Sequence, residues 1–203
     1  MNKMDLHELV MATNNAGKAR EIAAVLEAFN IKVVPQSQFA VPEVEETGLT
    51  FVENALIKAR HAARYSRHPV IADDSGIAVD ALGGRPGIYS ARYAGVGAGD
   101  TANNEKLLQE LAEVPEAQRG ARFICVMVLM QHAEDPTPII CQGVWEGRIL
   151  RAPQGDNGFG YDPLFLVPQE NCSSAQLPPE RKNQLSHRGQ ALRAMVAEIK
   201  KYV

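Results

Sequence analysis

The chain has 203 residues and a formal net charge of -3, with 45% hydrophobic and 22% charged residues. These values are ordinary for a globular protein in water with one substantial core, or with two lobes that share a sheet. The negative net charge argues against a nucleic-acid polymer as partner, because proteins that bind phosphate backbones usually display a net basic surface. A small anionic ligand remains compatible with it.

Cysteine usage and hydropathy indicate the compartment. Cys125, Cys141 and Cys172 form neither a CxxC motif nor an even framework, so we expect reduced thiols and a cytoplasmic protein. The opening residues, MNKMDLHELVMAT, lack a long apolar segment, which argues against a signal peptide. The longest apolar run, FICVMVLM at 123–130, is too short to cross a bilayer as a helix. It predicts a strand buried on both faces, and we expect no membrane partner.

The periodicity of apolar residues predicts alternating strands and helices. In chain order, these are a strand over 8–13, a helix over 14–29, a strand over 31–35, a helix over 50–66, a strand over 69–73, a helix over 101–113, strands over 121–132, 139–150 and 163–168, and a helix over 187–203. The first strand–helix–strand unit favours parallel pairing, and AEDPTP before the fifth strand favours an antiparallel hairpin. The glycine-rich segment 83–100 predicts a long functional loop with one extended piece. The pattern predicts an α/β fold with a mixed sheet, whose loops line a cleft.

Two adjacent carboxylates, Asp73 and Asp74, stand at the predicted end of the third strand. Because neighbouring side chains on a strand point to opposite faces, at most one of them enters a given cleft. Magnesium prefers carboxylate and phosphate oxygens and needs only one or two protein carboxylates. One acid from this pair and one from the acidic loop, Glu45 or Glu46, would suffice. The alternatives are an Asx turn or helix cap for the pair and a solvated loop for the glutamates.

The segment TNNAGK (13–18) lies between the first predicted strand and helix. Unpaired amides at a helix N-terminus suit phosphate oxygens, and Lys18 adds a cation. The alternative is a turn capped by Asn14 or Asn15, with a solvated lysine. No Walker loop, GxSxG elbow or zinc-ligand spacing is present, so the common nucleotide and hydrolase motifs are absent.

Basic residues gather just before the last predicted helix, in RKNQLSHRG (181–189). Lys182, His187 and Arg188 oppose the helix dipole there, which suggests that they bind a ligand. The alternative is simple surface charge.

The segment GFGYD (158–162) combines aromatic rings with a carboxylate. Phe159 could stack on a planar base while Asp162 accepts a hydrogen bond from it. For Tyr161, packing under the loop is the favoured interpretation.

Five ordered segments together resemble the inosine/xanthosine triphosphate pyrophosphatases, and the resemblance covers nearly the whole chain. The segments are ATNNAGKAREI, EETGLTFVENALIKARHAA, IADDSGIAVDALGGRPGIYSARYAG, DNGFGYDP and SHRGQAL. The resemblance implies an elongated two-lobed α/β fold around a long mixed sheet with flanking helices, formed as a single domain over 1–203, with the active-site cleft between the lobes. It also implies Mg2+-dependent hydrolysis of deaminated purine nucleoside triphosphates (ITP, dITP and XTP) to the monophosphate and pyrophosphate. Such an enzyme would be a cytoplasmic homodimer that cleanses the nucleotide pool.

By position, the resemblance implies a role for each matched residue. Asp74 would be the catalytic proton acceptor, with Asp73 sharing that role as an alternative, and Glu46 and Asp74 would hold the metal. Substrate contacts are implied for Thr13, Asn14, Asn15, Ala16, Gly17, Lys18, Lys58, Ser75, Phe159, Gly160, Tyr161, Asp162, Lys182, His187 and Arg188. Selectivity against adenine would follow if Arg188 donates to O6 and Asp162 accepts from N1–H, because adenine would leave both groups unpaired.

Three other interpretations remain. The first is a pyrimidine triphosphate pyrophosphatase of the related Maf-type fold, against which the SHRG and GFGYD segments argue. The second is a nucleotide-binding sensor without turnover, against which the intact acidic residues argue. The third is a purely structural domain. Under this interpretation, the five polar segments would have arisen by chance.

Overall fold

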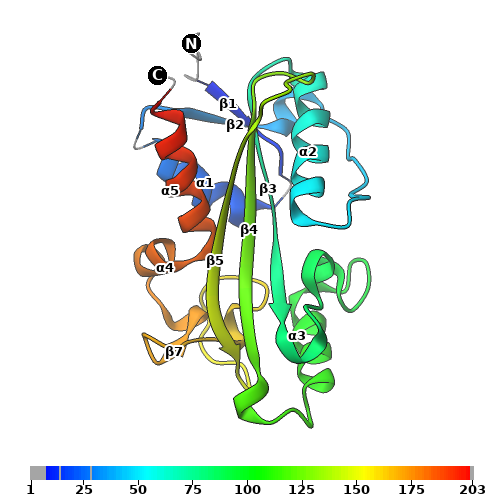
Figure 1. The fold of residues 1–203 in the computed structure, drawn as a ribbon, viewed down its shortest axis with the longest axis vertical. Helices are drawn as coiled ribbons and strands as arrows, with labels where there is room; N and C mark the ends of the chain where they lie inside the picture. The colour runs from blue at the N-terminus through cyan, green and yellow to red at the C-terminus, as the bar shows by residue number, and fades with distance from the viewer. Residues whose placement is uncertain (1–7, 14, 28, 202–203) are drawn as a thin grey trace. The chain divides into compact units, whose positions relative to one another are not determined.

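The computed structural model describes residues 8–13, 15–27 and 29–201, which form two compact units (Figure 1). The first unit comprises Met1–Asp74, Cys125–Gly143 and Arg188–Val203, and the second comprises Ser75–Ile124 and Val144–His187. The strands are β1 (Glu8–Met11), β2 (Lys32–Pro35), β3 (Val70–Val79), β4 (Gly120–Met130), β5 (Ile139–Ile149), β6 (Phe165–Val167) and β7 (Cys172–Ser173). The α-helices are α1 (Ala16–Glu27), α2 (Phe51–Ser66), α3 (Gly99–Glu110), α4 (Pro179–Leu185) and α5 (His187–Ile199).

The strands form one mixed sheet in the order β2-β1-β3-β4-β5-β6-β7. β1 is parallel to β2 and to β3, which confirms the parallel pairing predicted for the first two strands. β5 and β6, and β6 and β7, are antiparallel. The predicted α/β class with a mixed sheet and flanking helices is therefore confirmed. Among the described helices, none combines the length and apolarity that a bilayer crossing requires.

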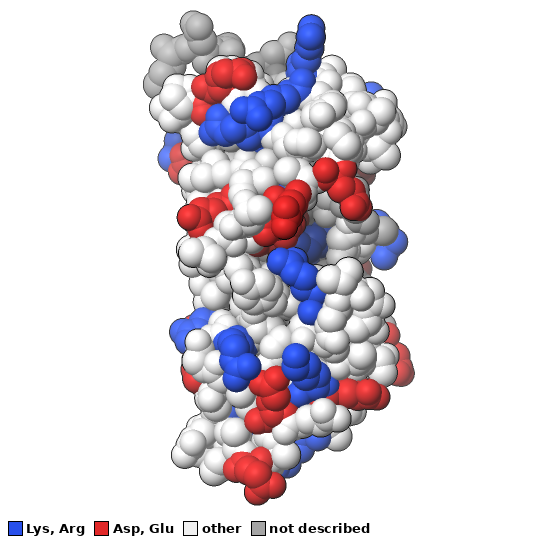
Figure 2. All heavy atoms as spheres, turned by 90° about the vertical axis from the view of Figure 1, so that its right-hand side faces the viewer, with Lys and Arg blue, Asp and Glu red and all other residues white. Residues whose placement is uncertain are grey.

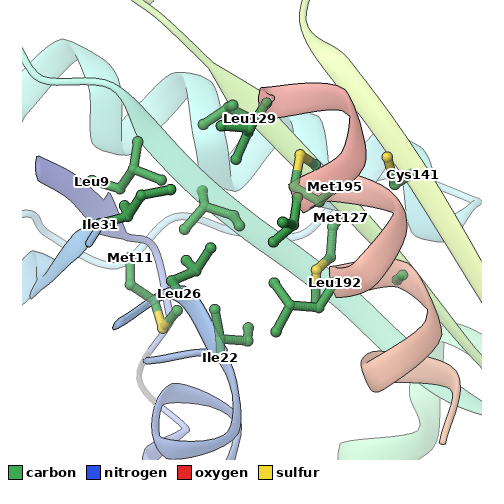
Figure 3. Packing of buried hydrophobic residues seen from close by; sticks show 14 of the residues in the cluster. Leu9, Met11, Ile22, Leu26, Ile31, Met127, Leu129, Cys141, Leu192 and Met195 are labelled. Atoms are coloured by element: carbon green, nitrogen blue, oxygen red, sulfur yellow. The ribbon is translucent and has the colours of Figure 1, made fainter. Parts of the chain in front are cut away.

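In the first unit, side chains alternate between the two faces of the sheet. Leu9 and Met11 lie in one buried cluster with residues of α1 and α5 (Figure 3). Val10 and Ala12 lie in another cluster, with the alanines of α2. The period of two along a strand therefore separates an α1/α5 face from an α2 face.

The second unit has its own core. Phe123, Trp145 and Phe165 contact one another through their rings, at centroid distances from 4.5 to 6.4 Å. Leu107 of α3 is fully buried in the same cluster. Burial of these large side chains is the main source of stability for this unit.

Two predictions, on the end of β3 and on the segment 83–100, were wrong. β3 does not end at Asp73 but continues to Val79, because both carboxylates have cationic partners and the residues after them, Ile77 to Val79, are again buried. The extended piece expected within 83–100 is instead a 3-10 turn over Gly87–Arg92. Glycines with positive φ before it, such as Gly84 at 88°, turn the chain and prevent a strand.

Candidate active site

The turn between β1 and α1 is organised by Asn15. The Asn15 Oδ1 accepts hydrogen bonds from the amides of Gly17 (2.9 Å) and Lys18 (3.1 Å), and the Asn15 amide donates to Thr13 Oγ1 (3.1 Å). Asn15 is therefore the cap, and it fixes the start of the helix from which Lys18 projects. The predicted contact residue Asn14 lies outside the described residues, and Ala16 is the first residue of α1.

Asp73 lies on the α1/α5 face, in register with Ile71. Its Oδ2 is 3.1 Å from Lys18 Nζ, 3.7 Å from Arg188 Nε and 3.9 Å from the thiol of Cys125. The side chain is 1% exposed. Burial alone would raise the pKa of Asp73, but the nearby cations, with Lys18 foremost, hold it well below its usual range. Asp73 is therefore charged near neutral pH and lies beside a cation of α1 and another of α5.

Asp74 lies on the opposite, α2 face. Its Oδ1 accepts a hydrogen bond from Lys58 Nζ at 3.1 Å, and the same ammonium is 2.8 Å from Glu46 Oε1. Burial raises the pKa of Asp74, and the charge of Glu46 adds to this, while Lys58 opposes it. Burial lowers the pKa of Lys58, but Asp74, Asp73 and Glu46 outweigh burial, so the net shift is upward. Glu46 and Asp74, the two predicted metal ligands, thus come from separate segments and both contact the Lys58 ammonium.

These residues fit a magnesium ion, because both carboxylates reach one cation of the protein. Among the residues that the structure describes, no group of three or more His, Cys, Asp or Glu side chains gathers as a metal cluster. Magnesium does not require one, since it usually keeps several waters and uses one or two protein carboxylates together with substrate phosphates. Glu46 and Asp74 already share one cation, the ammonium of Lys58.

Asn54 belongs to this site, although the sequence analysis did not identify it. The residue is fully buried; its Nδ2 donates to Asp74 Oδ2 at 3.3 Å, and its Oδ1 accepts from the amide of Gly48 at 2.8 Å. It therefore joins the acidic loop to β3. The available signal was its position four residues before Lys58, which places both side chains on one face of a helix.

In the second unit, the 158–162 loop is built around Asp162. The buried carboxylate, 3% exposed, accepts from the Phe159 amide (2.8 Å), Lys182 Nζ (2.8 Å) and the Ser174 hydroxyl (2.9 Å). A Cβ at Gly158 would lie 2.1 Å from Asp162 Oδ2, so only glycine fits there. In this geometry Phe159, Asp162 and Lys182 lie together.

The aromatic residues of the loop have different environments. The ammonium of Lys182 lies 4.9 Å from the centroid of the Phe159 ring. Tyr161 is buried, and its hydroxyl donates to the carbonyl of Ser90 at 2.8 Å. The packing interpretation of Tyr161 is therefore confirmed. His187 is also buried and stacks on Phe123 at 4.8 Å and 10°.

The predicted site residues are divided between the two units. The first unit holds the 13–18 turn, Glu46, Lys58, Asp74 and Arg188, and the second holds residues 159–162, Lys182 and His187. Half-buried Ser75 follows Asp74 in β3 and belongs to the second unit.

A family model described as the Ham1 family matches residues 9–198. The chain belongs to this family. It is 61% identical over 194 residues to the dITP/XTP pyrophosphatase of Vibrio cholerae, covering 96% of this chain and 97% of that protein. It is also 60% identical to the dITP/XTP pyrophosphatase of Pseudomonas aeruginosa, covering 92% and 94%. The solved structure of a HAM1 protein from Coxiella burnetii matches this Ham1-family chain with a TM-score of 0.90 at 48% identity, covering 96% and 98%.

Proposed function

We propose that the protein is a Mg2+-dependent pyrophosphatase that hydrolyses dITP, XTP and ITP to the nucleoside monophosphate and pyrophosphate. The convergence of Glu46 and Asp74 on one ammonium carries the proposal. Relatives of about 60% identity that are named dITP/XTP pyrophosphatases support the substrate class.

The first requirement of this reaction is charge neutralisation, because a nucleoside triphosphate carries about four negative charges near neutral pH. Lys18 and Lys58 supply two cations, each of which is held by a carboxylate of β3. Residues 13–18 would contact the phosphates through the backbone of the turn and through Lys18. In this proposal the lysines and the metal together contribute most of the acceleration.

Glu46 and Asp74 would hold the metal. When bound there, magnesium supplies positive charge beside the phosphates and lowers the pKa of water. Asp74 is the proposed proton acceptor. In the metal-free protein, burial raises its pKa. The lowered pKa of Asp73 makes it a weak base, so we assign it to positioning Lys18.

Base recognition is assigned to the 158–162 loop, Lys182, His187 and Arg188. Phe159 would stack on the purine, and cationic donors would match the O6 acceptor of hypoxanthine or xanthine. Three donors already occupy Asp162, and a carboxylate offers about four acceptor sites, so N1–H would take the remaining one. The contact between Arg188 and O6 stays a prediction.

We further propose that residues 1–203 act as a single domain in a cytoplasmic homodimer, with no nucleic-acid or membrane partner. Figure 2 shows acidic and basic side chains interspersed with uncharged surface on the face that it draws, rather than the basic expanse typical of a protein that binds a phosphate backbone.

A panel of triphosphates, assayed with and without Mg2+ and scored for pyrophosphate against orthophosphate, tests the function. We expect pyrophosphate from dITP, XTP and ITP only with the metal, and little turnover of ATP. Preferred turnover of pyrimidine triphosphates would favour the Maf-type interpretation. Binding of ITP without any product would favour a sensor.

A further inference from the structure

Both peptide groups of Gly160 are bonded to side chains of α3. The Gly160 amide donates to Asp100 Oδ2 at 2.7 Å, and Asn104 Nδ2 donates to the Gly160 carbonyl at 2.9 Å. Asp100 and Asn104 are four residues apart, so they lie on the same face of the helix. This helix therefore satisfies the backbone of a residue in the middle of the 158–162 loop.

The helix that makes these contacts is itself fixed within the second unit. Asn103 Oδ1 accepts from the amide of Ala94 at 2.7 Å, and Lys106 Nζ donates to the carbonyl of Tyr93 at 2.7 Å. Leu107 is fully buried on the same helix. Asp100 and Asn104 thus project from an anchored element rather than from a mobile one.

Gly160 is the point where the loop needs such support. It has a φ of 62°, in the left-handed region, and it lies between the Phe159 ring and the Asp162 carboxylate in sequence. Backbone in this conformation does not pair with a neighbouring strand. The amide and carbonyl of Gly160 must therefore bond to side chains or water. The two hydrogen bonds from α3 therefore hold the part of the loop that carries Phe159.

We propose that Asp100 and Asn104 are positioning residues that set the affinity and selectivity for the purine base by fixing the 158–162 loop. The inference rests on the proposed function, which assigns base recognition to this loop. A displaced loop misplaces the stacking ring and Lys182 but leaves the groups at the phosphates in place. Loss of these bonds therefore raises KM and weakens base selectivity while kcat changes little.

The chemistry of the two bonds predicts an asymmetry between conservative variants. In Asp100→Asn the amide oxygen still accepts from Gly160 N–H, so this variant should behave as wild type. In Asn104→Asp a carboxylate, which has no donor, faces the Gly160 carbonyl, so this variant should be impaired at least as much as Asn104→Ala. Glu105→Ala is the matched control, because it truncates the residue next to Asn104 on the same helix, whose side chain is exposed.

The test measures dITP and dATP kinetics with Mg2+, inhibition by pyrophosphate, and amide hydrogen exchange of residues 153–164 in the unliganded protein. For Asn104→Ala and Asn104→Asp we expect KM for dITP to rise about three- to tenfold, the size of effect of one net hydrogen bond, with kcat within about twofold. Exchange in the loop should accelerate, the preference for dITP over dATP should fall, and the Ki of pyrophosphate should not change. Asp100→Asn and Glu105→Ala should keep the wild-type KM and preference.

Two results would overturn the inference alone while wild-type protein turns over dITP: an unchanged KM and preference in Asn104→Asp, or an equal loss in Glu105→Ala. A wild-type protein that releases no pyrophosphate from dITP would overturn the proposed function itself, and the inference with it.

Discussion

The substitution Asp73→Asn removes one negative charge from between Lys18 and Arg188. At distances of 3.1 and 3.7 Å, each attraction amounts to about 5 kcal/mol for an effective dielectric constant of about 20. Desolvation of the buried carboxylate offsets much of this gain. Removal of one partner from a buried ion pair typically costs about 3–5 kcal/mol, because the remaining charge stays buried. The Lys18 side chain is 14% exposed and so retains some hydration, which favours the lower end, about 3 kcal/mol.

The sign of the pH dependence follows from the lowered pKa of Asp73. A carboxyl group whose folded pKa lies below its unfolded value, about 3.9, adds stability that is complete above the unfolded value. This contribution is lost as the pH falls through the folded pKa. The difference in stability between wild type and Asp73→Asn should therefore be constant from about pH 5 to 8 and shrink below about pH 4.

Thermal unfolding followed by circular dichroism measures this effect. About 3 kcal/mol should lower Tm by roughly 6–12 °C in a chain of this length. Asp80→Asn is the control, since Asp80 also pairs with an arginine, Arg122, but is exposed, and its loss should move Tm by less than about 2 °C. An Asp73→Asn protein with the Tm of the control, or a difference that grows with acidification, would refute the reasoning.

Four further predictions concern the α2 face and base recognition. Asp74→Asn should lower kcat by about a hundred- to ten-thousandfold, the usual contribution of a general base, with an unchanged circular dichroism spectrum; near-normal turnover would remove Asp74 from the mechanism. Because burial raises the pKa of Asp74 in the metal-free protein and Mg2+ binds its charged form, the Mg2+ concentration needed for half-maximal rate should rise as the pH falls toward the ordinary value of about 3.9, and a requirement independent of pH would contradict this. Asn54→Ala should raise the Mg2+ concentration needed for half-maximal rate about three- to tenfold by loosening the link between Gly48 and Asp74, and an unchanged requirement would count against that role. Arg188→Ala should lose the preference for ITP over ATP, whereas an unchanged ratio would refute base reading by Arg188.

For Asp73 and Asp74, the sequence predicted one structural feature correctly and another wrongly. Alternation along a strand predicted that the two carboxylates separate to opposite faces, and they do so. The same reasoning ended β3 at this pair, because buried charges normally mark the end of a strand. Their cationic partners, Lys18 and Lys58, lie 55 and 16 residues earlier in the chain, and no local pattern reports such pairing.

Local chemistry explains the other successes and failures. Asn15 was predictable as a cap because capping depends on two or three adjacent residues. Asn104 was missed because a lone asparagine in a helix carries no signal until its partner is known. Asn54 was missed because its one signal, the four-residue spacing to Lys58, does not identify its partner Asp74. Tyr161 was correctly interpreted as packed, because an aromatic residue in a glycine-rich loop usually supports that loop from beneath.

Hydrolysis of dITP in 18O-labelled water tests the central claim most directly, which is attack of water on the phosphorus nearest the nucleoside. With Mg2+ present, the account predicts one 18O atom in the nucleoside monophosphate and none in the pyrophosphate, as read by mass spectrometry. Label found in pyrophosphate, or release of labelled orthophosphate, would contradict it.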